Sequence, residues 1–273
     1  MDEKRLLQAC ELVDAGKLAE AYDEFVQLAE NTPDPIEKAW PLIYAANTLQ
    51  TLGQEEAATA QLSAARALIE THRPSNPATN EMFAAAESFL DFDDANLIWL
   101  RGGSLEEALS RFNAALKKHR LALKDLRARG LYEAIQIRRA FILADLDRWK
   151  ESLAILEEIE SPQEYKEGVA FYLGHCYLAA HDHTRAEQKL TEALSLGGLP
   201  HSLEYRAHCE LGMTYYELQN YAQAKRELEK GAATADKSYL KDGIVWKYLE
   251  ATCRALRRKD EAEHYASLTR PSS

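Results

Sequence analysis

The sequence predicts an all-α fold, an α-solenoid of antiparallel helix pairs, and three observations carry the prediction. Gly and Pro are scarce, at 12 and 8 of 273 residues, while Ala, Leu and Glu recur throughout, a composition that favours helices. Apolar residues recur with helical spacing, and strand patterns are nearly absent. A short phrase, in which a turn precedes a small residue and an apolar residue follows four positions later, appears seven times.

The seven copies of this phrase follow one another along the chain. The small and apolar residues are Ala21 and Phe25, Ala58 and Leu62, Ala108 and Phe112, Ser152 and Leu156, Ala186 and Leu190, Ala224 and Leu228, with a weaker copy at Ala262. The spacing is 34 residues from Ser152 to Ala186 but 50 from Ala58 to Ala108. Longer helices are therefore expected in the middle repeats.

This pattern resembles the tetratricopeptide repeat (TPR), a helix pair with a period of 34 residues. Two copies carry its residues in order: Leu173, Gly174, Tyr177, Ala186, Leu190 and Ala193, then Leu211, Gly212, Tyr215, Ala224 and Leu228. The resemblance covers almost the whole chain and implies one right-handed α-solenoid, an α-α superhelix of about seven TPR-like helix pairs over residues 1–273. The repeats are expected at roughly 3–33, 36–71, 77–118, 123–160, 163–197, 202–235 and 240–268.

Close contacts between helices explain the small residues of the pattern. Neither helix of a pair can bury its apolar stripe without the neighbouring pair. We expect Gly174 and Ala186, like Gly212 and Ala224, to lie where helices touch, with the tyrosine three residues after each glycine filling the space above.

Two helix starts are marked independently of any family. Asp34 precedes Pro35 and Glu37, which predicts a capped first helix of a repeat. Ser104 precedes Glu107 in a capping box, which predicts the start of a second helix.

Composition excludes several classes of protein. A net charge of -11 argues against a general nucleic-acid binder, because such proteins need a positive field. No apolar stretch resembles a signal peptide or a membrane span, so we expect a cytoplasmic protein without a membrane partner. The four cysteines, at positions 10, 176, 209 and 253, form no CxxC and are expected to be reduced thiols.

In TPR proteins the first helix of each repeat usually lines a concave groove, and the resemblance implies a peptide-binding groove here. Its residues would be Trp40, Ile43, Asn47, Gln50, Asp93, Leu97, Arg101, Ile137, Phe141, Phe171, His175, Cys209, Met213, Tyr216, Lys247 and Arg254. If these side chains face water, the groove is apolar and aromatic and should attract an apolar or helical segment of a partner protein. The alternative is that they pack on one another inside a tight superhelix.

Some TPR proteins hold the acidic C-terminus of chaperones with a clamp of Lys, Asn and Arg side chains. This chain offers Leu6 and Cys10 at the first clamp positions, and Asn47 alone does not rebuild it. Chaperone-tail binding is therefore disfavoured.

Charge is distributed unevenly, which suggests a second binding surface. Residues 1–56 carry twelve acidic and four basic side chains, whereas residues 111–139 carry nine basic ones against Asp125 and Glu133. A basic helix at 117–129 would bind an acidic partner segment or the acidic N-terminus of another protomer; alternatively it is a solvated helix face.

No catalytic site, metal site or cofactor site is predicted. His181 and His183 flank Asp182 in a helix-helix turn, where neighbouring side chains point apart. His175 and Cys176 are adjacent on a helix and diverge by about 100 degrees. The sequence has no Gly-rich phosphate loop, G-x-S-x-G elbow or H-E-x-x-H.

Three functions remain as hypotheses. The first is a non-catalytic scaffold that binds a peptide or helical segment of a partner in its groove. The second is self-association into a homo-oligomer through the same surfaces or a poorly capped terminal repeat. The third is a regulator resembling the TPR-containing aspartyl-phosphate phosphatases; those proteins carry an added N-terminal helical bundle, whereas this chain begins almost at once with a repeat.

Overall fold

The computed structural model describes residues 1–75, 80–122, 130–159, 162 and 165–269. Within these residues the chain forms fifteen helices and no strand, which confirms the all-α prediction. The chain divides into two compact units, residues 1–139 and 140–273. The boundary between the units lies inside α7 (Leu131–Asp145).

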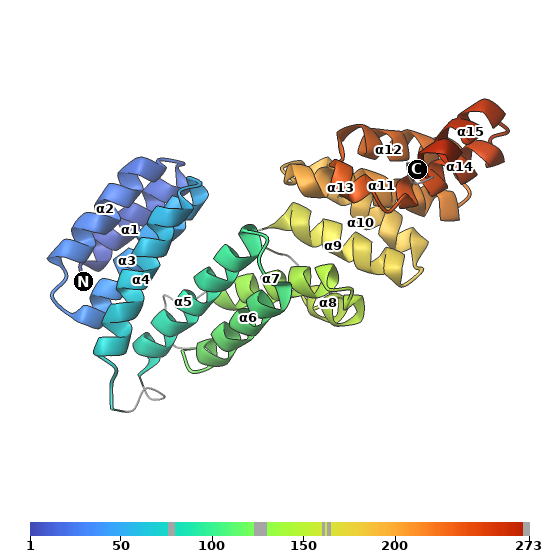
Figure 1. Ribbon diagram of the computed structural model, residues 1–273. Coiled ribbons are helices and arrows are strands. Elements are labelled where there is room, and N and C mark those ends of the chain that lie inside the picture. Colours follow the sequence, from blue (N-terminus) through green and yellow to red (C-terminus); the bar gives the residue numbers. More distant parts are fainter. Residues whose placement is uncertain (76–79, 123–129, 160–161, 163–164, 270–273) are drawn as a thin grey trace. The chain divides into compact units, whose positions relative to one another are not determined.

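The first unit contains three helix pairs and the start of a fourth (Figure 1). They are α1 (Glu3–Asp14) with α2 (Leu18–Asn31), α3 (Pro35–Thr51) with α4 (Glu55–Thr71), α5 (Glu81–Leu100) with α6 (Leu105–His119), and the first part of α7.

The second unit continues with the partner of α7 and three further pairs. They are α8 (Trp149–Leu156), α9 (Lys166–Ala179) with α10 (His183–Leu196), α11 (His201–Glu217) with α12 (Tyr221–Thr234), and α14 (Ile244–Ala255) with α15 (Lys259–Leu268). A single turn, α13 (Lys237–Leu240), precedes α14. The predicted ranges 77–118, 123–160 and 163–197 each begin outside the described residues.

The turn inside each pair has the same geometry. In each, one residue with positive φ lets the next backbone N–H reach back five residues, which is the Schellman end of a helix. This bond measures 2.8 Å from Lys17 N to the Leu12 carbonyl and 2.9 Å from Asp182 N to the Tyr177 carbonyl. The positive-φ residues are Gly16, Gly53, Gly102, Asp147, His181, Gln219 and Arg257. Their recurrence marks seven helix pairs in the described chain.

Both predicted helix starts are confirmed. Asp34 accepts a 2.8 Å hydrogen bond from the backbone N–H of Glu37 and caps α3. Ser104 accepts one of 3.3 Å from the N–H of Glu107 and caps α6.

The expectation of longer middle helices is confirmed in only one repeat. Helix α5 has 20 residues, against 14 in α9. In the fourth pair the expectation is wrong, because α7 has 15 residues and α8 only 8. Helix α6 ends at His119, α7 begins at Leu131, and residues 120–122 are not helical.

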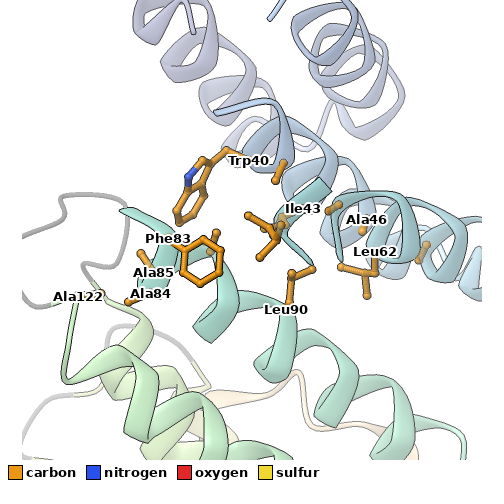
Figure 2. Close-up of a cluster of buried hydrophobic side chains, with 14 of the residues drawn as sticks. Trp40, Ile43, Ala46, Leu62, Phe83, Ala84, Ala85, Leu90 and Ala122 are labelled. Carbon is orange, nitrogen blue, oxygen red and sulfur yellow. The ribbon is translucent and has the colours of Figure 1, made fainter. Parts of the chain in front are cut away.

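The core of the first unit lies between neighbouring pairs. Figure 2 shows Trp40 and Ile43 of α3 beside Phe83 and Leu90 of α5, and all four side chains are at most 1% exposed. Leu62 of α4 extends the same cluster. First helices of consecutive pairs therefore pack on one another and not only on their own partners.

Small residues lie where helices touch, as predicted. Ala186 and Ala224 are fully buried in α10 and α12. A β-carbon added to Gly174 or Gly212 would lie 2.6 Å from the Cγ atom of a leucine in the second helix of its pair. The tyrosines three residues after these glycines, Tyr177 and Tyr215, are also buried.

Candidate functional site

All sixteen predicted groove residues lie on, or directly end, the first helix of a pair. Four belong to α3, three to α5 and its last turn, two to α7, two to α9, three to α11 and two to α14. The assignment to first helices therefore agrees with the structure, while the binding role of these residues remains a prediction.

Burial corrects the expected character of that surface. Nine of the sixteen are buried: Trp40, Ile43, Asp93, Leu97, Ile137, Phe141, Phe171, Cys209 and Met213. The expectation of a solvated apolar groove is wrong for these residues, because neighbouring first helices pack directly on one another. Seven members are partly or fully exposed: Asn47, Gln50, Arg101, His175, Tyr216, Lys247 and Arg254. What remains accessible is polar, with one tyrosine.

In the first unit, two predicted groove residues face each other. The side-chain amide of Asn47 lies against the carboxylate of Asp93, and with its nitrogen toward the two oxygens the distances are 2.7 and 3.2 Å. Asp93 is 1% exposed. Burial, with a smaller contribution from Asp94, raises the pKa of Asp93 well above its usual value. This pair is an internal polar contact and leaves little carboxylate surface for a ligand.

The second unit holds a polar network that the sequence did not reveal, centred on Arg206 of α11. The Arg206 guanidinium lies 3.1 Å from the Asp145 carboxylate and 3.9 Å from that of Glu210. It also covers the ring of Phe171, at 5.2 Å from the centroid. The Tyr172 hydroxyl donates a 2.9 Å hydrogen bond to Asp145. Three successive first helices, α7, α9 and α11, thus share one charged cluster.

His175 joins the same network through Glu210. The Nδ1 atom of His175 lies 3.1 Å from both carboxylate oxygens, so Nδ1–H is the donor. The negative charge of Glu210 raises the pKa of His175 against the opposing effect of burial. Burial acts to raise the pKa of Glu210, but His175 and Arg206 outweigh it and hold that pKa below its usual value. The network therefore stabilises a protonated histidine beside an ionised carboxylate.

Three partly exposed tyrosines form a second group on neighbouring helices: Tyr216 of α11, Tyr221 of α12 and Tyr248 of α14. The ring of Tyr216 is 5.3 Å from that of Tyr248 and 5.6 Å from that of Tyr221, both edge-to-face. The Tyr248 hydroxyl donates a 3.2 Å hydrogen bond to Glu217. Lys247 precedes Tyr248 on α14 and is exposed. Of the tyrosines, only Tyr216 was predicted from the repeat pattern.

The contact between Arg206 and Glu210 could have been predicted from the sequence. They stand four residues apart on one helix, the spacing at which opposite charges face each other. Asp145 and Tyr172 lie on two other helices, and no local pattern brings them to Arg206.

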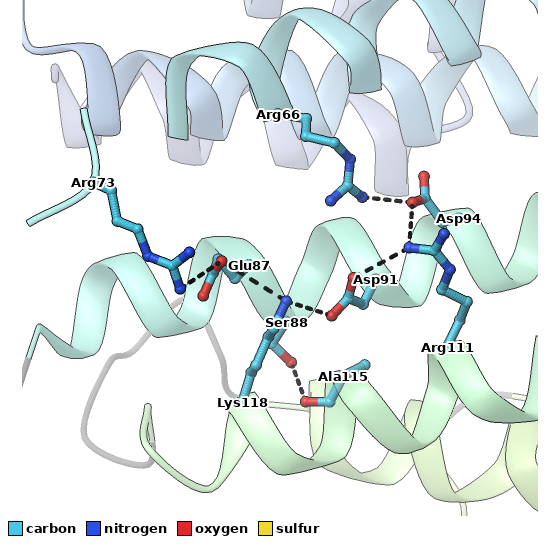
Figure 3. Close-up of polar contacts among 9 residues, drawn as sticks. All are labelled: Arg66, Arg73, Glu87, Ser88, Asp91, Asp94, Arg111, Ala115 and Lys118. Carbon is cyan, nitrogen blue, oxygen red and sulfur yellow. Dashed lines mark hydrogen bonds and ion pairs between the residues drawn. The ribbon is translucent and has the colours of Figure 1, made fainter. Parts of the chain in front are cut away.

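Charged residues of the first unit pair internally between α4, α5 and α6 (Figure 3). Asp94 lies 2.5 Å from Arg66 and 3.6 Å from Arg111, and Asp91 lies 2.7 Å from Lys118. Arg111 and Lys118 belong to the basic segment 111–139, and these carboxylates neutralise them.

The predicted basic helix at 117–129 is corrected. Helix α6 ends at His119 and residues 120–122 are not helical, so the segment is not one continuous helix. Residues 123–129 lie outside the described part of the chain.

The two histidine motifs have structural roles. Asp182 caps α10 by accepting a 3.1 Å hydrogen bond from Arg185 N, and His181 occupies the positive-φ position of the turn. Burial raises the pKa of Cys176 to about 11, so its thiol is protonated at neutral pH. Among the described residues no three His, Cys, Asp or Glu side chains are arranged to hold a metal ion. No helix of the described chain is both long and apolar enough to span a bilayer.

Comparison with solved structures places this architecture among helical-repeat proteins. The apo form of RapI is 13% identical with a TM-score of 0.56, and the match covers 98% of this chain and 75% of RapI. Apo NprR, described as a quorum sensor from B. thuringiensis, is 13% identical with a TM-score of 0.55, covering 97% of this chain and 85% of NprR.

A third similar structure is YrrB, described as a TPR protein with an unusual peptide-binding site. It is 19% identical with a TM-score of 0.48, covering 86% of this chain and 97% of YrrB. No protein-family model matches the sequence, and no curated protein matches it significantly. The repeated helix pairs, with their shared turn geometry and the TPR residues at their contacts, show that the chain is a TPR-like helical-repeat protein.

Proposed function

We propose that the chain is a non-catalytic module that binds a segment of a partner protein along the first helices of its second unit, α9, α11 and α14. The observation that carries this proposal is the position of Arg206. Its guanidinium is held by two carboxylates and an aromatic ring, and its side chain is still 22% exposed. Partly exposed tyrosines lie on α11 and α14. Arginine and tyrosine are among the residue types most enriched where binding energy concentrates in protein interfaces.

The binding surface differs from the groove predicted from the repeat pattern. It consists of His175, Arg206, Tyr216, Lys247 and Tyr248, all partly or fully exposed. Phe171, a buried residue of the predicted groove, lies against two of these side chains, Arg206 and His175. An occupant would have to offer hydrogen-bonding groups as well as apolar surface, because the accessible part of this face is mixed in character.

Two further observations support a binding role. Burial raises the pKa of Cys209 to about 12, as it raises that of Cys176, so neither thiol supplies a nucleophile at neutral pH. NprR, which has a similar fold, is described as a quorum sensor, which supports a role in recognition.

The four unpaired thiols support a cytoplasmic location, where thiols stay reduced.

Photo-crosslinking from two positions tests the surface. A photoreactive phenylalanine analogue replaces Tyr216 in one variant and Leu196 in the other; Leu196 lies on the second helix α10 and is 50% exposed. We expect a cellular partner to crosslink from position 216 and not from position 196. Equal crosslinking from both positions would count against the proposal.

A matched pair of charge reversals completes the test. Lys247→Glu changes the proposed surface, whereas Lys189→Glu makes the same change on α10. We expect recovery of the crosslinked partner to fall only with the change at 247. If both variants recover the partner equally well, the first helices of the second unit are not its binding site.

A further inference from the structure

The last described helix pair, α14 and α15, has an open groove on the face where earlier pairs meet another helix. In the second unit, α10 packs against α11 and α12 against α14. The corresponding face of α14 and α15 is followed by no described helix. It forms a groove of about 790 Å³, lined mainly by Arg254, Arg257, Lys259, Ala262, Glu263 and Ala266.

The floor of this groove is built from unusually small residues. In earlier pairs, the residue four positions after the small residue of the repeated phrase is large and buried, as Leu190 and Leu228 are. In the last pair that position is Ala266, which leaves space beside Ala262. A large apolar side chain could enter there without displacing any part of the chain.

The rim of the groove is positively charged. Arg257 forms no ion pair within the described residues. Arg254 pairs with Glu250 at 2.6 Å and Lys259 with Glu263 at 3.8 Å, each within one helix, and the two cations are 71% and 86% exposed. Ion pairs with such exposed cations contribute little stability, so these cations remain available to a second carboxylate.

The opposite end of the described chain carries the complementary surface. Glu3, Glu11 and Asp14 of α1 are exposed and form no ion pair with a described cation. Residues 1–33 hold eight acidic and three basic side chains. Leu7, on the same helix, is 65% exposed, and no described helix covers it.

We propose that α1 of a second copy of this chain docks in the groove of α14 and α15, head to tail. Leu7 supplies apolar surface for the small-residue floor, and the carboxylates of α1 meet the rim of Arg254, Arg257 and Lys259. The contact joins two different surfaces, so each copy can bind a neighbour at either end and assembly continues past the dimer or closes into a ring. This inference does not rest on the partner-binding surface proposed above.

Sedimentation velocity of the full chain over a concentration series, at about 50 and 300 mM salt, tests the contact. We expect the average mass to rise with concentration and the association to weaken at the higher salt. Arg257→Glu and Glu11→Lys should each weaken association about tenfold. Lys166→Glu and Glu56→Lys make the same changes at exposed sites on α9 and α4 and should leave association unchanged.

The double variant Glu11→Lys with Arg257→Glu makes the test specific. It exchanges the charges across the proposed contact, so we expect association to recover to within about threefold of wild type. Circular dichroism confirms that every variant is folded. A monomer at all concentrations overturns the proposal, as does association that both single variants leave intact. Loss in both single variants without recovery in the double variant overturns the pairing of these two surfaces.

Discussion

Gly174 of α9 and Leu190 of α10 are so close that residue 174 has no room for a side chain. A β-carbon at this position would lie 2.6 Å from Leu190 Cγ and 3.1 Å from the Leu190 backbone nitrogen. Gly212 and Leu228 repeat the relationship in the next pair, at 2.6 Å and 2.8 Å. The glycine of the repeat pattern therefore sets the distance between the two helices of a pair.

Gly174→Ala should destabilise the protein by about 1–3 kcal/mol, because the added methyl group overpacks the contact. The glycine lies inside a helix, where alanine alone would be favoured by about 1 kcal/mol, so the clash must exceed that gain. Urea denaturation followed by circular dichroism measures the change in the free energy of unfolding.

Leu190→Ala provides the control for this prediction. Removing the leucine makes space for the methyl group, so the two changes together should cost less than the sum of the single ones. Additive effects, or a Gly174→Ala variant as stable as wild type, would show that the two helices are not in contact here.

The sequence predicts the helix pairs well because each depends on local signals. The cap at Asp34 and the close contact of Gly174 are each specified within a few residues or within one pair. The fourth pair was predicted less well, since its 44-residue spacing from Ala108 to Ser152 fitted longer helices and a longer connection equally. Only the structure shows that α8 is short.

The groove was harder to predict because exposure depends on how neighbouring pairs pack. The pattern put Phe171 and His175 on the correct helix, but it could not show that Phe171 is covered by Arg206 of the next pair. The charged network likewise joins Asp145 to Arg206, 61 positions apart. Such contacts follow from the spacing of whole helices.

The left-handed turn residues give a prediction about stability. Gln219 has φ of 60°, a conformation that costs a residue with a side chain about 1–2 kcal/mol. Gln219→Gly removes that strain, but it also raises the conformational entropy of the unfolded chain, which disfavours folding. We expect a net stabilisation of about 0.5 kcal/mol. The midpoint of urea unfolding measures it.

Gly53→Ala is the reciprocal control. Gly53 has φ of 71°, and an added β-carbon would meet no atom within 4 Å, so only backbone strain changes. We expect a loss of about 1 kcal/mol. If both substitutions shift the midpoint of urea unfolding in the same direction, the left-handed backbone conformation of the turn does not account for the changes in stability.

Asp93→Asn should stabilise the protein at neutral pH. Burial raises the pKa of Asp93 in the folded state above its unfolded value near 3.9. Ionisation of Asp93 therefore lowers the free energy of unfolding, and this loss develops as pH rises above that unfolded value. The asparagine removes the buried charge and can still bond to Asn47, for a gain of about 1–2 kcal/mol at pH 7. The gain should shrink as pH approaches 4.

Asp23→Asn, at an exposed site on α2, is the control and should change stability by less than about 0.5 kcal/mol. A destabilised Asp93→Asn variant at pH 7 would show that the carboxylate is better paired than its surroundings indicate.

His175→Gln should destabilise the second unit more in acid than in base. Glu210 raises the folded-state pKa of His175 above the unfolded value near 6.5, so protonated His175 binds the carboxylate most strongly below that value. This contribution is lost as pH rises through the folded-state pKa.

We expect the difference in unfolding free energy between wild type and the His175→Gln variant to be larger at pH 5.5 than at pH 8.5 by about 1 kcal/mol. This is the size of a charged hydrogen bond that is partly buried. Urea denaturation at the two pH values measures it, and His264→Gln on the exposed face of α15 controls for the loss of a histidine as such. Since Glu210 supplies the charge, Glu210→Gln should abolish the pH-dependent part of the His175→Gln effect; if that part survives, the titrating partner of His175 is another group of the network.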